Sequence, residues 1–142
     1  MILPDVNVLI YAFRADSPRH AVCKRWLDGI VVGEAQFGVS PLALSAVARI
    51  ATNPRIFKQP SPVAEAFAFC DNLLGQPHCE QVRPGPRHWS IFTRICLESG
   101  VRGPRISDAW FAALAIEHGC AWIACDRDYA QFPELDWREP SL

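Results

Sequence analysis

Short apolar runs alternate along the chain with longer segments that carry helix start and stop signals, and this alternation constrains the fold most. Ser-Pro pairs at 17–18, 40–41 and 61–62 are typical helix starts, because Ser caps free amides and Pro at the first helical position loses no hydrogen bond. Glycines and an Asn-Pro pair mark the ends of the predicted helices. The predicted helices span roughly 18–28, 41–52, 62–74, 87–98 and 107–118.

The runs between these helices are predicted to be short strands. One ends at about Asp5, and the others cover Gln36–Val39, Cys79–Val82 and Ala121–Cys125. Strands that alternate with helices in this way indicate an α/β sandwich built on a parallel sheet. The 142 residues, half of them hydrophobic, suit one packed domain spanning 1–142.

The six cysteines show no Cys-x-x-Cys spacing and lie mostly within apolar runs. We therefore expect buried reduced thiols rather than a disulfide framework or a zinc site. No signal peptide is visible, and no apolar run approaches the ~20 residues that a membrane span needs. These features predict a cytoplasmic protein with no membrane partner.

Aspartates stand where the predicted strands end and a helix begins. Asp5 ends the first strand, and Asp126 ends the last one, with Asp128 two residues later. Asp108 lies in the first turn of a helix, after a segment, Arg105-Ile106, that is expected to be extended. In a parallel sheet, strand carboxyl ends and the following helix starts share one edge, where ligands bind. The carboxylates are therefore predicted to converge.

Clustered carboxylates raise one another's pKa unless a cation neutralises them. Oxygen ligands without His or Cys select hard cations such as Mg²⁺ or Mn²⁺. Such an ion activates water and stabilises charge on a transferred phosphate, which suits hydrolysis of a phosphodiester bond. The pattern thus predicts a metal-dependent hydrolase with Asp5, Asp108 and Asp126 as ligands and Asp128 assisting.

Each aspartate also has a structural interpretation. Asp108 could be only a favourable anion at a helix N-terminus, and residues 126–128 could form a solvated turn. Asp5 is harder to explain in this way, because a carboxylate between apolar runs risks burial without a partner. The joint placement of the three acids on one edge favours the metal site.

These segments, in this order, resemble the motifs of PIN-domain ribonucleases, specifically the VapC toxins of bacterial toxin–antitoxin pairs. The resemblance implies a Rossmann-like three-layer α/β/α sandwich with a four- to five-stranded parallel sheet. It also implies Mg²⁺- or Mn²⁺-dependent endoribonuclease activity, homodimerisation and a VapB-like antitoxin. By position, Asp5, Asp108 and Asp126 match the metal-coordinating acids, and Asn7 matches a supporting polar residue. The segments are DVNVLIY (5–11), SPLALSAVARIATNPRIF (40–57), ISDAWFAALAIEHGC (106–120) and CDRDYAQFPELDWREP (125–140).

One departure from the family affects the site. The family commonly carries a Glu in the helix that follows the second strand, at the position of Ala46, and neither Ala46 nor Ser45 is acidic. This places coordination of two metal ions in doubt. By sequence logic Asp128 is the nearest substitute, and Ser45 could at best hold a water bound to the ion.

The only clearly positive stretch lies between residues 83 and 105, with five Arg against one acid. A formal net charge of −1 excludes a general attraction to nucleic acid, so any RNA contact is local. Arg102 and Arg105 precede Asp108 and are the candidate phosphate contacts. A solvated helix face is the alternative. Trp89 could stack a base, but its helical spacing with Phe92 favours a place in the core.

Two other functions remain open. A non-catalytic RNA- or protein-binding relative is credible because of Ala46. A phosphatase-like α/β hydrolase would use Asp5 as a covalent nucleophile, but that chemistry usually needs a second Asp two residues later and a nearby Lys. Asn7 and the presence of only two lysines argue against it.

Overall fold

The computed structural model describes residues 1–141, so the last residue of the predicted domain 1–142 lies outside the described part. Strands alternate with helices as the sequence pattern indicates. The elements are β1 (Ile2–Pro4), α1 (Val6–Phe13), α2 (His20–Val32), β2 (Phe37–Val39), α3 (Pro41–Ala51), α4 (Val63–Leu74), β3 (Cys79–Gln81), α5 (His88–Ser99), α6 (Arg105–His118), β4 (Ala121–Ile123), a 3-10 helix η1 (Arg127–Gln131) and β5 (Trp137–Arg138).

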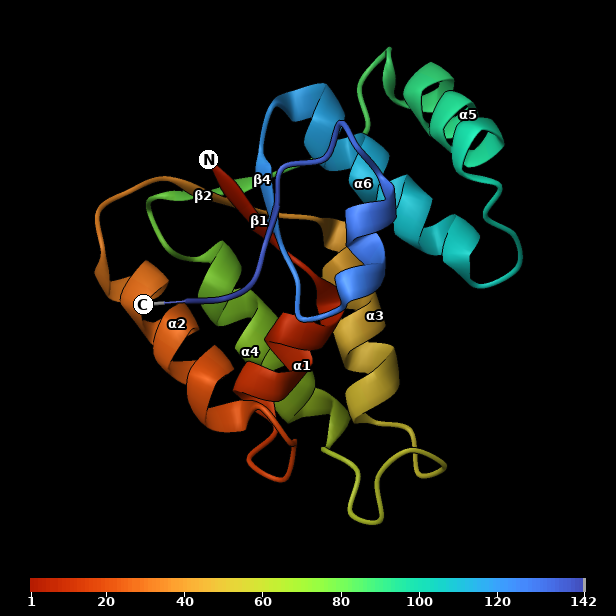
Figure 1. The fold of residues 1–142 in the computed structure, drawn as a ribbon. Coiled ribbons are helices and arrows are strands. Elements are labelled where there is room, and N and C mark those ends of the chain that lie inside the picture. Colours follow the sequence, from red (N-terminus) through yellow and green to blue (C-terminus); the bar gives the residue numbers. More distant parts are fainter. Residues whose placement is uncertain (142) are drawn as a thin grey trace.

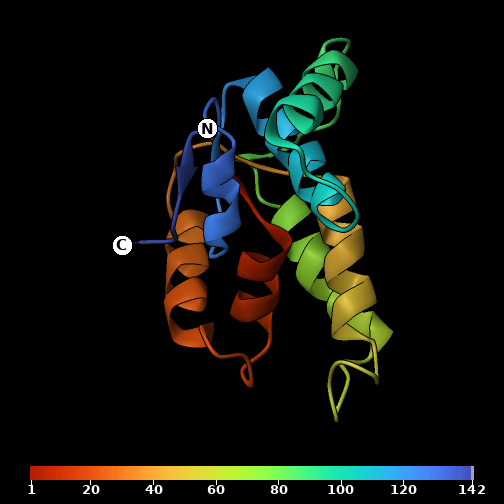
Figure 2. The same ribbon diagram turned by 45° about the vertical axis from the view of Figure 1, so that its right-hand side comes forward.

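The five strands form one parallel sheet in the order β3-β2-β1-β4-β5. The helices α2 and α4 lie on one side of the strands, and α5 and α6 lie on the other (Figure 1 and Figure 2). This is the predicted three-layer α/β/α arrangement. Because β1 is central, the residue that follows it lies in the middle of the edge formed by the strand carboxyl ends.

The core forms where these helices meet the sheet. Trp122 of β4 is fully buried and stacks on Phe111 of α6, with ring centroids 5.3 Å apart and an interplanar angle of 20°. Leu114 of α6 is also fully buried. The thiols of the six cysteines are free, as expected. Within residues 1–141, no helix is both long and apolar enough to cross a membrane.

Local signals explain most boundaries, with some corrections. Ser40 caps α3 as predicted, its Oγ accepting a hydrogen bond from the Ala43 amide at 3.4 Å, and Pro41 opens the helix. Ser17 does not cap α2: its hydroxyl donates instead to the carbonyls of Tyr11 and Arg14. Likewise Ser61 precedes α4, which begins after Pro62 without a side-chain cap.

Two other expectations were wrong. Residues 105 and 106 form the first turn of α6 and are not extended, because the amide of Ile106 donates to the carbonyl of Gly103. Trp89 is 70% exposed, and its neighbour His88 takes the buried position on α5. The Nε2 atom of His88 lies 3.0 Å from the carbonyl oxygen of Trp110, which joins α5 to α6.

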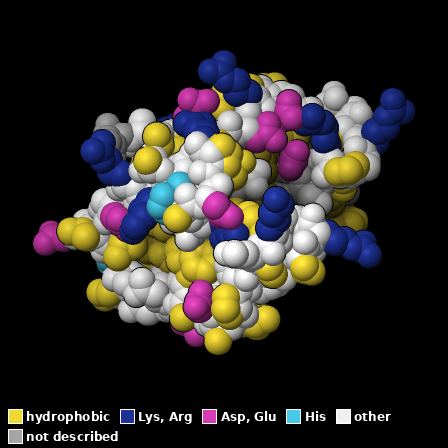
Figure 3. Space-filling model, turned by 90° about the horizontal axis from the view of Figure 1, so that it is seen from below, with side chains coloured by type: hydrophobic (Ala, Val, Ile, Leu, Met, Phe, Trp, Pro, Cys, Tyr) yellow, Lys and Arg dark blue, Asp and Glu magenta, His cyan; other side chains and the backbone are white. Residues whose placement is uncertain are grey.

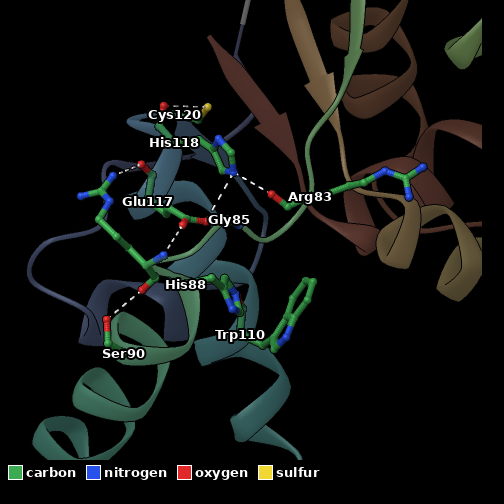
Figure 4. Close-up of polar contacts among 9 residues, drawn as sticks. Arg83, Gly85, His88, Ser90, Trp110, Glu117, His118 and Cys120 are labelled. Atoms are coloured by element: carbon green, nitrogen blue, oxygen red, sulfur yellow. Dashed lines mark hydrogen bonds and ion pairs between the residues drawn. The ribbon is translucent and has the colours of Figure 1, made fainter.

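A buried carboxylate holds the loop before α5 against the end of α6 (Figure 4). Glu117 is 9% exposed, and its two oxygens accept hydrogen bonds from the amides of Gly85 at 2.7 Å and Arg87 at 2.9 Å. A Cβ atom on Gly85 would lie 2.7 Å from Glu117 Oε2, so any other residue there would displace this carboxylate from its present position. Although burial acts to raise it, these two amides lower the pKa of Glu117 below its ordinary value.

We expect Glu117→Ala to lower the free energy of unfolding by about 3 kcal/mol, because two amides lose their acceptors and each unpaired buried group costs about 1–3 kcal/mol. Glu117→Gln keeps one acceptor oxygen and should lose about half as much. Urea denaturation at pH 7 measures both losses. Equal stability of Glu117→Ala and the parent protein would contradict the role assigned to this carboxylate.

Candidate active site

Backbone pairing places two of the predicted acids beside each other. The amide of Asp5 donates to the carbonyl of Ile123 at 2.8 Å, which joins the end of β1 to the end of β4. Asp126 follows three residues later and caps η1, its Oδ1 accepting from the amide of Asp128 at 2.8 Å. Ala124, the first of the two residues between these points, is fully buried. The two strand ends therefore deliver both carboxylates to one edge of the sheet.

A cavity of about 430 Å³ lies at this edge. Its lining includes Asp5, Asp108 and Asp126, which come from the start of α1, the first turn of α6 and the start of η1. Figure 3 views the molecule from the side towards which β1 and α3 run, and acidic side chains lie close to basic ones on this face. Carboxylates more than a hundred residues apart along the chain thus share one cavity.

Asp5 is the most buried of these acids, with 5% of its surface exposed. Its Oδ1 caps α1 by accepting from the amide of Val6 at 2.8 Å. Burial raises the pKa of Asp5 to about 7, and the nearby charges of Asp108 and Asp126 act in the same direction. The folded protein thus holds a carboxylate whose negative charge is disfavoured where it stands.

Tyr129 links two of the acids, and the sequence reasoning did not single it out. Its hydroxyl lies 3.3 Å from Asp5 Oδ1 and 3.5 Å from Asp108 Oδ1. Burial raises the pKa of Tyr129 well above its ordinary value, so the hydroxyl stays protonated and has one proton to donate. Both distances exceed the usual length of an O–H···O bond, so Tyr129 orients the two carboxylates loosely.

Asp108 is half-buried, and burial followed by the charge of Asp126 raises its pKa above the ordinary value. Asp128 is not among the residues that line the cavity of Asp5. Its carboxylate forms an ion pair with Arg105, and it lines a neighbouring cavity of about 650 Å³. The structure does not bring Asp128 to the cavity that contains Asp5, so its assisting role remains a prediction.

The predicted supporting residues do reach the cavity. Asn7 and Ser45 both line it, and so does Ala46, the position where the family commonly has Glu. Arg49, which the sequence reasoning missed, is the only Lys or Arg among its lining residues. The spacing of Arg49 on α3, one turn after Ser45, is the signal that could have identified it.

Arg102 and Arg105 line the neighbouring cavity, as their position before Asp108 suggested. Asp108 and Asp126 line both cavities, so the two hollows adjoin at these acids. Both arginines are exposed, although Arg105 is engaged by Asp128. The positive charge is therefore local to one side of the acidic site.

The chemistry of the donor set fits a hard divalent cation, because the acids offer oxygen ligands only. Burial, together with the charges of neighbouring carboxylates, raises the pKa of Asp5 and of Asp108, so a bound cation would favour their ionised forms. Within residues 1–141, no three His, Cys, Asp or Glu side chains are grouped closely enough to hold an ion by themselves. Mg²⁺ usually keeps several waters and one or two carboxylates, so a closed protein cage is not required.

Comparison with known proteins adds to this geometry. Residues 2–135 match the PIN domain family. The chain belongs to the PIN-domain family. Within it, this PIN domain is 42% identical over all 142 residues to ribonuclease VapC31 of Mycobacterium tuberculosis, with full coverage of both chains. It is 40% identical to ribonuclease VapC25 of the same organism, again with full coverage. These matches place it among the VapC relatives.

Solved structures share the fold of this PIN domain. VapBC2 from Rickettsia felis, bound to a DNA fragment from its promoter, gives a TM-score of 0.71 at 12% identity and covers 99% of this chain and 100% of that one. The sarcin-ricin loop cleaving toxin VapC20 of Mycobacterium tuberculosis gives 0.67 at 16% identity and covers 97% and 99%. At these identities the likeness shows the fold alone.

Proposed function

We propose that this PIN-domain protein is a Mg²⁺- or Mn²⁺-dependent endoribonuclease and the toxin of a VapBC-type pair. One observation carries the proposal: Asp5, Asp108 and Asp126, far apart in sequence, line the same cavity at the strand carboxyl ends. The raised pKa values of Asp5 and Asp108 support it, because a bound cation would relieve the negative charge. The names of the relatives at 40–42% identity support ribonuclease chemistry.

The three carboxylates would hold the ion together with several waters, and the bound ion would supply an activated water and stabilise charge on the transferred phosphate. The chain supplies the positioning. Both hydrogen bonds to the Asp5 side chain from within residues 1–141 reach Oδ1, which leaves Oδ2 for a ligand. The cap formed by Asp126 fixes its Oδ1 on the amide of Asp128 in the same way. Each acid is thus oriented through one oxygen.

Partners follow from the same assignment. A VapB-like antitoxin, homodimer formation and a cytoplasmic location belong to the proposal, with RNA as the substrate. Hydrophobic side chains exposed on α3 and α4 support a protein partner, since Leu42, Val63 and Phe67 are each at least half exposed. An amphipathic helix of the antitoxin would cover such side chains.

The test of this function is cleavage of structured RNAs by the purified full chain. We expect cleavage with Mg²⁺ or Mn²⁺, loss of cleavage with EDTA, and recovery when excess Mn²⁺ is added. Binding of the same RNAs is measured in parallel. If several RNAs bind but none is cleaved with either ion, the protein is the non-catalytic relative that Ala46 made credible, and the proposal is wrong.

The basic side of the site gives a separate prediction. Removing both arginines in Arg102→Ala/Arg105→Ala should weaken RNA binding and reduce the slope of log affinity against log salt by about 1.4, because each phosphate contact to a single strand contributes about 0.7. Arg25→Ala/Arg55→Ala removes two exposed charges from elsewhere and serves as the matched control. Equal slopes for the two double variants would show that Arg102 and Arg105 form only a solvated face.

A further inference from the structure

We propose that the apolar half of the acidic cavity, between α3 and the helices α5 and α6, receives an unpaired base of the nucleotide next to the cleaved phosphate. This inference rests on the proposed function, since it assumes an RNA strand at the acids. We call this half of the cavity the base chamber. Its walls are Leu42, Ala46 and Ile50 of α3, Phe92 of α5, and Ile106 and Trp110 of α6.

Continuity with the acids is the first argument. The base chamber and the three acids line one cavity, and Asp108 and Asp126 also line the cavity that contains Arg102 and Arg105. A phosphodiester held at Asp108 and Asp126 therefore lies where the two cavities adjoin. The strand must continue in both directions from that phosphate. One neighbouring nucleotide then enters the basic cavity, and the other enters the base chamber.

The second argument is the chemistry of the walls. Aliphatic and aromatic side chains dominate the chamber, and such surfaces take up the faces of unpaired bases. Arg49 is the only Lys or Arg lining the cavity and is exposed, so it can meet the phosphate attached to the same nucleotide. The whole cavity, acids included, has a volume of about 430 Å³, which lies in the range of about 300–1,000 Å³ that small-ligand sites have.

Ala46 is the third argument. A longer acidic side chain at this position on α3 would extend into the cavity and place a carboxylate among the apolar walls. Alanine instead leaves a methyl group there, with Leu42 and Ile50 one turn away on either side. The departure from the family pattern thus removes a charge and opens space in the chamber.

Contacts within the protein already hold the aromatic side chains of the chamber wall in place before any ligand binds. The ring of Trp110 meets His88 edge-on at 4.7 Å and Phe111 at 5.3 Å, and His88 Nε2 bonds the Trp110 carbonyl oxygen. The amides of Gly85 and Arg87 tie the start of α5 to Glu117, as described above. A base would therefore meet a wall that needs little reordering, which favours binding.

The test uses short single-stranded RNAs that carry fluorescent 2-aminopurine at one position, moved stepwise along the strand. Wild-type protein is first used to map the cleaved bond. Binding is then measured with Asp5→Asn, which keeps the chamber and is expected to slow cleavage by about 100- to 1,000-fold. We expect quenching of 2-aminopurine next to the mapped bond and little quenching at remote positions.

Filling the chamber supplies the matched variants, each made in the Asp5→Asn protein. Ala46→Leu should lower RNA affinity by about tenfold and abolish the quenching. Ala64→Leu makes the same change at an exposed position on α4 that does not line the cavity. It should change neither the RNA affinity nor the quenching of 2-aminopurine. An abasic nucleotide beside the cleaved bond should lower the affinity of the Asp5→Asn protein but have no further effect when Ala46→Leu is present.

Several outcomes would overturn the inference. If Ala46→Leu behaves like Ala64→Leu, or if the abasic nucleotide weakens both proteins equally, no base occupies the chamber, and a protein partner is the remaining occupant. In the cleaving protein, Ala46→Glu should lower activity because it fills the chamber. Faster cleavage would instead show that position 46 is a ligand position. If no RNA is cleaved, the proposed function fails, and the inference fails with it.

Discussion

Asp5→Asn is expected to lower the rate of RNA cleavage by about 100- to 1,000-fold while RNA binding is retained. Asn keeps the shape of Asp and an oxygen that can cap α1, but it lacks the negative charge that a divalent cation requires. Losing a single preorganised electrostatic contact in an active site typically costs this much. Single-turnover cleavage of one mapped RNA at saturating Mn²⁺ measures the change.

A matched control is available on α2. Asp28→Asn makes the same substitution at an exposed carboxylate that is paired with Lys24, and it should leave the cleavage rate within about twofold, since surface pairs contribute little. If Asp5→Asn cleaves as fast as Asp28→Asn, Asp5 is not part of the catalytic machinery. Trapping of an aspartyl-phosphate on Asp5 would instead revive the covalent mechanism of a phosphatase.

The same substitution is expected to stabilise the metal-free fold at pH 8, by up to about 4 kcal/mol. Burial raises the pKa of Asp5 from 3.8 to about 7, so folding at pH 8 keeps an ionised carboxylate where its charge is unfavourable. Asn is neutral and carries no such penalty. Urea denaturation in EDTA at pH 8 compares the two proteins.

The pH dependence of the parent protein's free energy of unfolding shows in which direction Asp5 acts. Between pH 7 and pH 3.8 the folded protein binds a proton at Asp5 that the unfolded chain does not, so the free energy of unfolding rises as the pH falls through this window. Asp5→Asn should lack that part of the rise. Glu117 has a lowered pKa and acts in the opposite sense, because its contribution to stability is lost as the pH falls below the ordinary value of 4.5. Parallel stability profiles for the two proteins would contradict the account of Asp5.

These two effects belong together. A carboxylate that destabilises the metal-free protein is compatible with a function that needs its charge. A bound cation would offset the cost of burying that charge. Activity and stability of the metal-free protein are therefore expected to change in opposite directions when Asp5 is replaced.

Much of the fold could be predicted because local signals decided it. Ser40 and Pro41 start α3 through side-chain and backbone preferences that act within one turn. Asp5 and Asp126 could be placed at one edge because Asp5 directly follows β1 and Asp126 comes three residues after the end of β4, and these two strands pair in parallel. The same positions make both residues helix caps, so the structural and functional interpretations of these acids are compatible.

The rest depends on contacts between distant segments. Tyr129 reaches Asp5 and Asp108 only because η1 folds back over the sheet edge, which no local pattern in residues 127–131 reveals. Trp110 lines the cavity together with residues of α3 and α5, which the pattern of its own helix does not indicate. The short β5 was not predicted either: the indole Nε1 of Trp137 donates to the carbonyl of Ala124, a tertiary contact that spacing cannot indicate.

Direct measurement of Mn²⁺ binding tests the central claim, which is that acids distant in sequence share one divalent ion. Titration calorimetry of the full chain should show Mn²⁺ binding that weakens at least about tenfold in each of Asp5→Asn, Asp108→Asn and Asp126→Asn. Asp128→Asn, whose carboxylate is paired with Arg105, should weaken it less. If the three single variants bind Mn²⁺ as tightly as the parent protein, these carboxylates do not form a metal site, and the nuclease assignment is wrong.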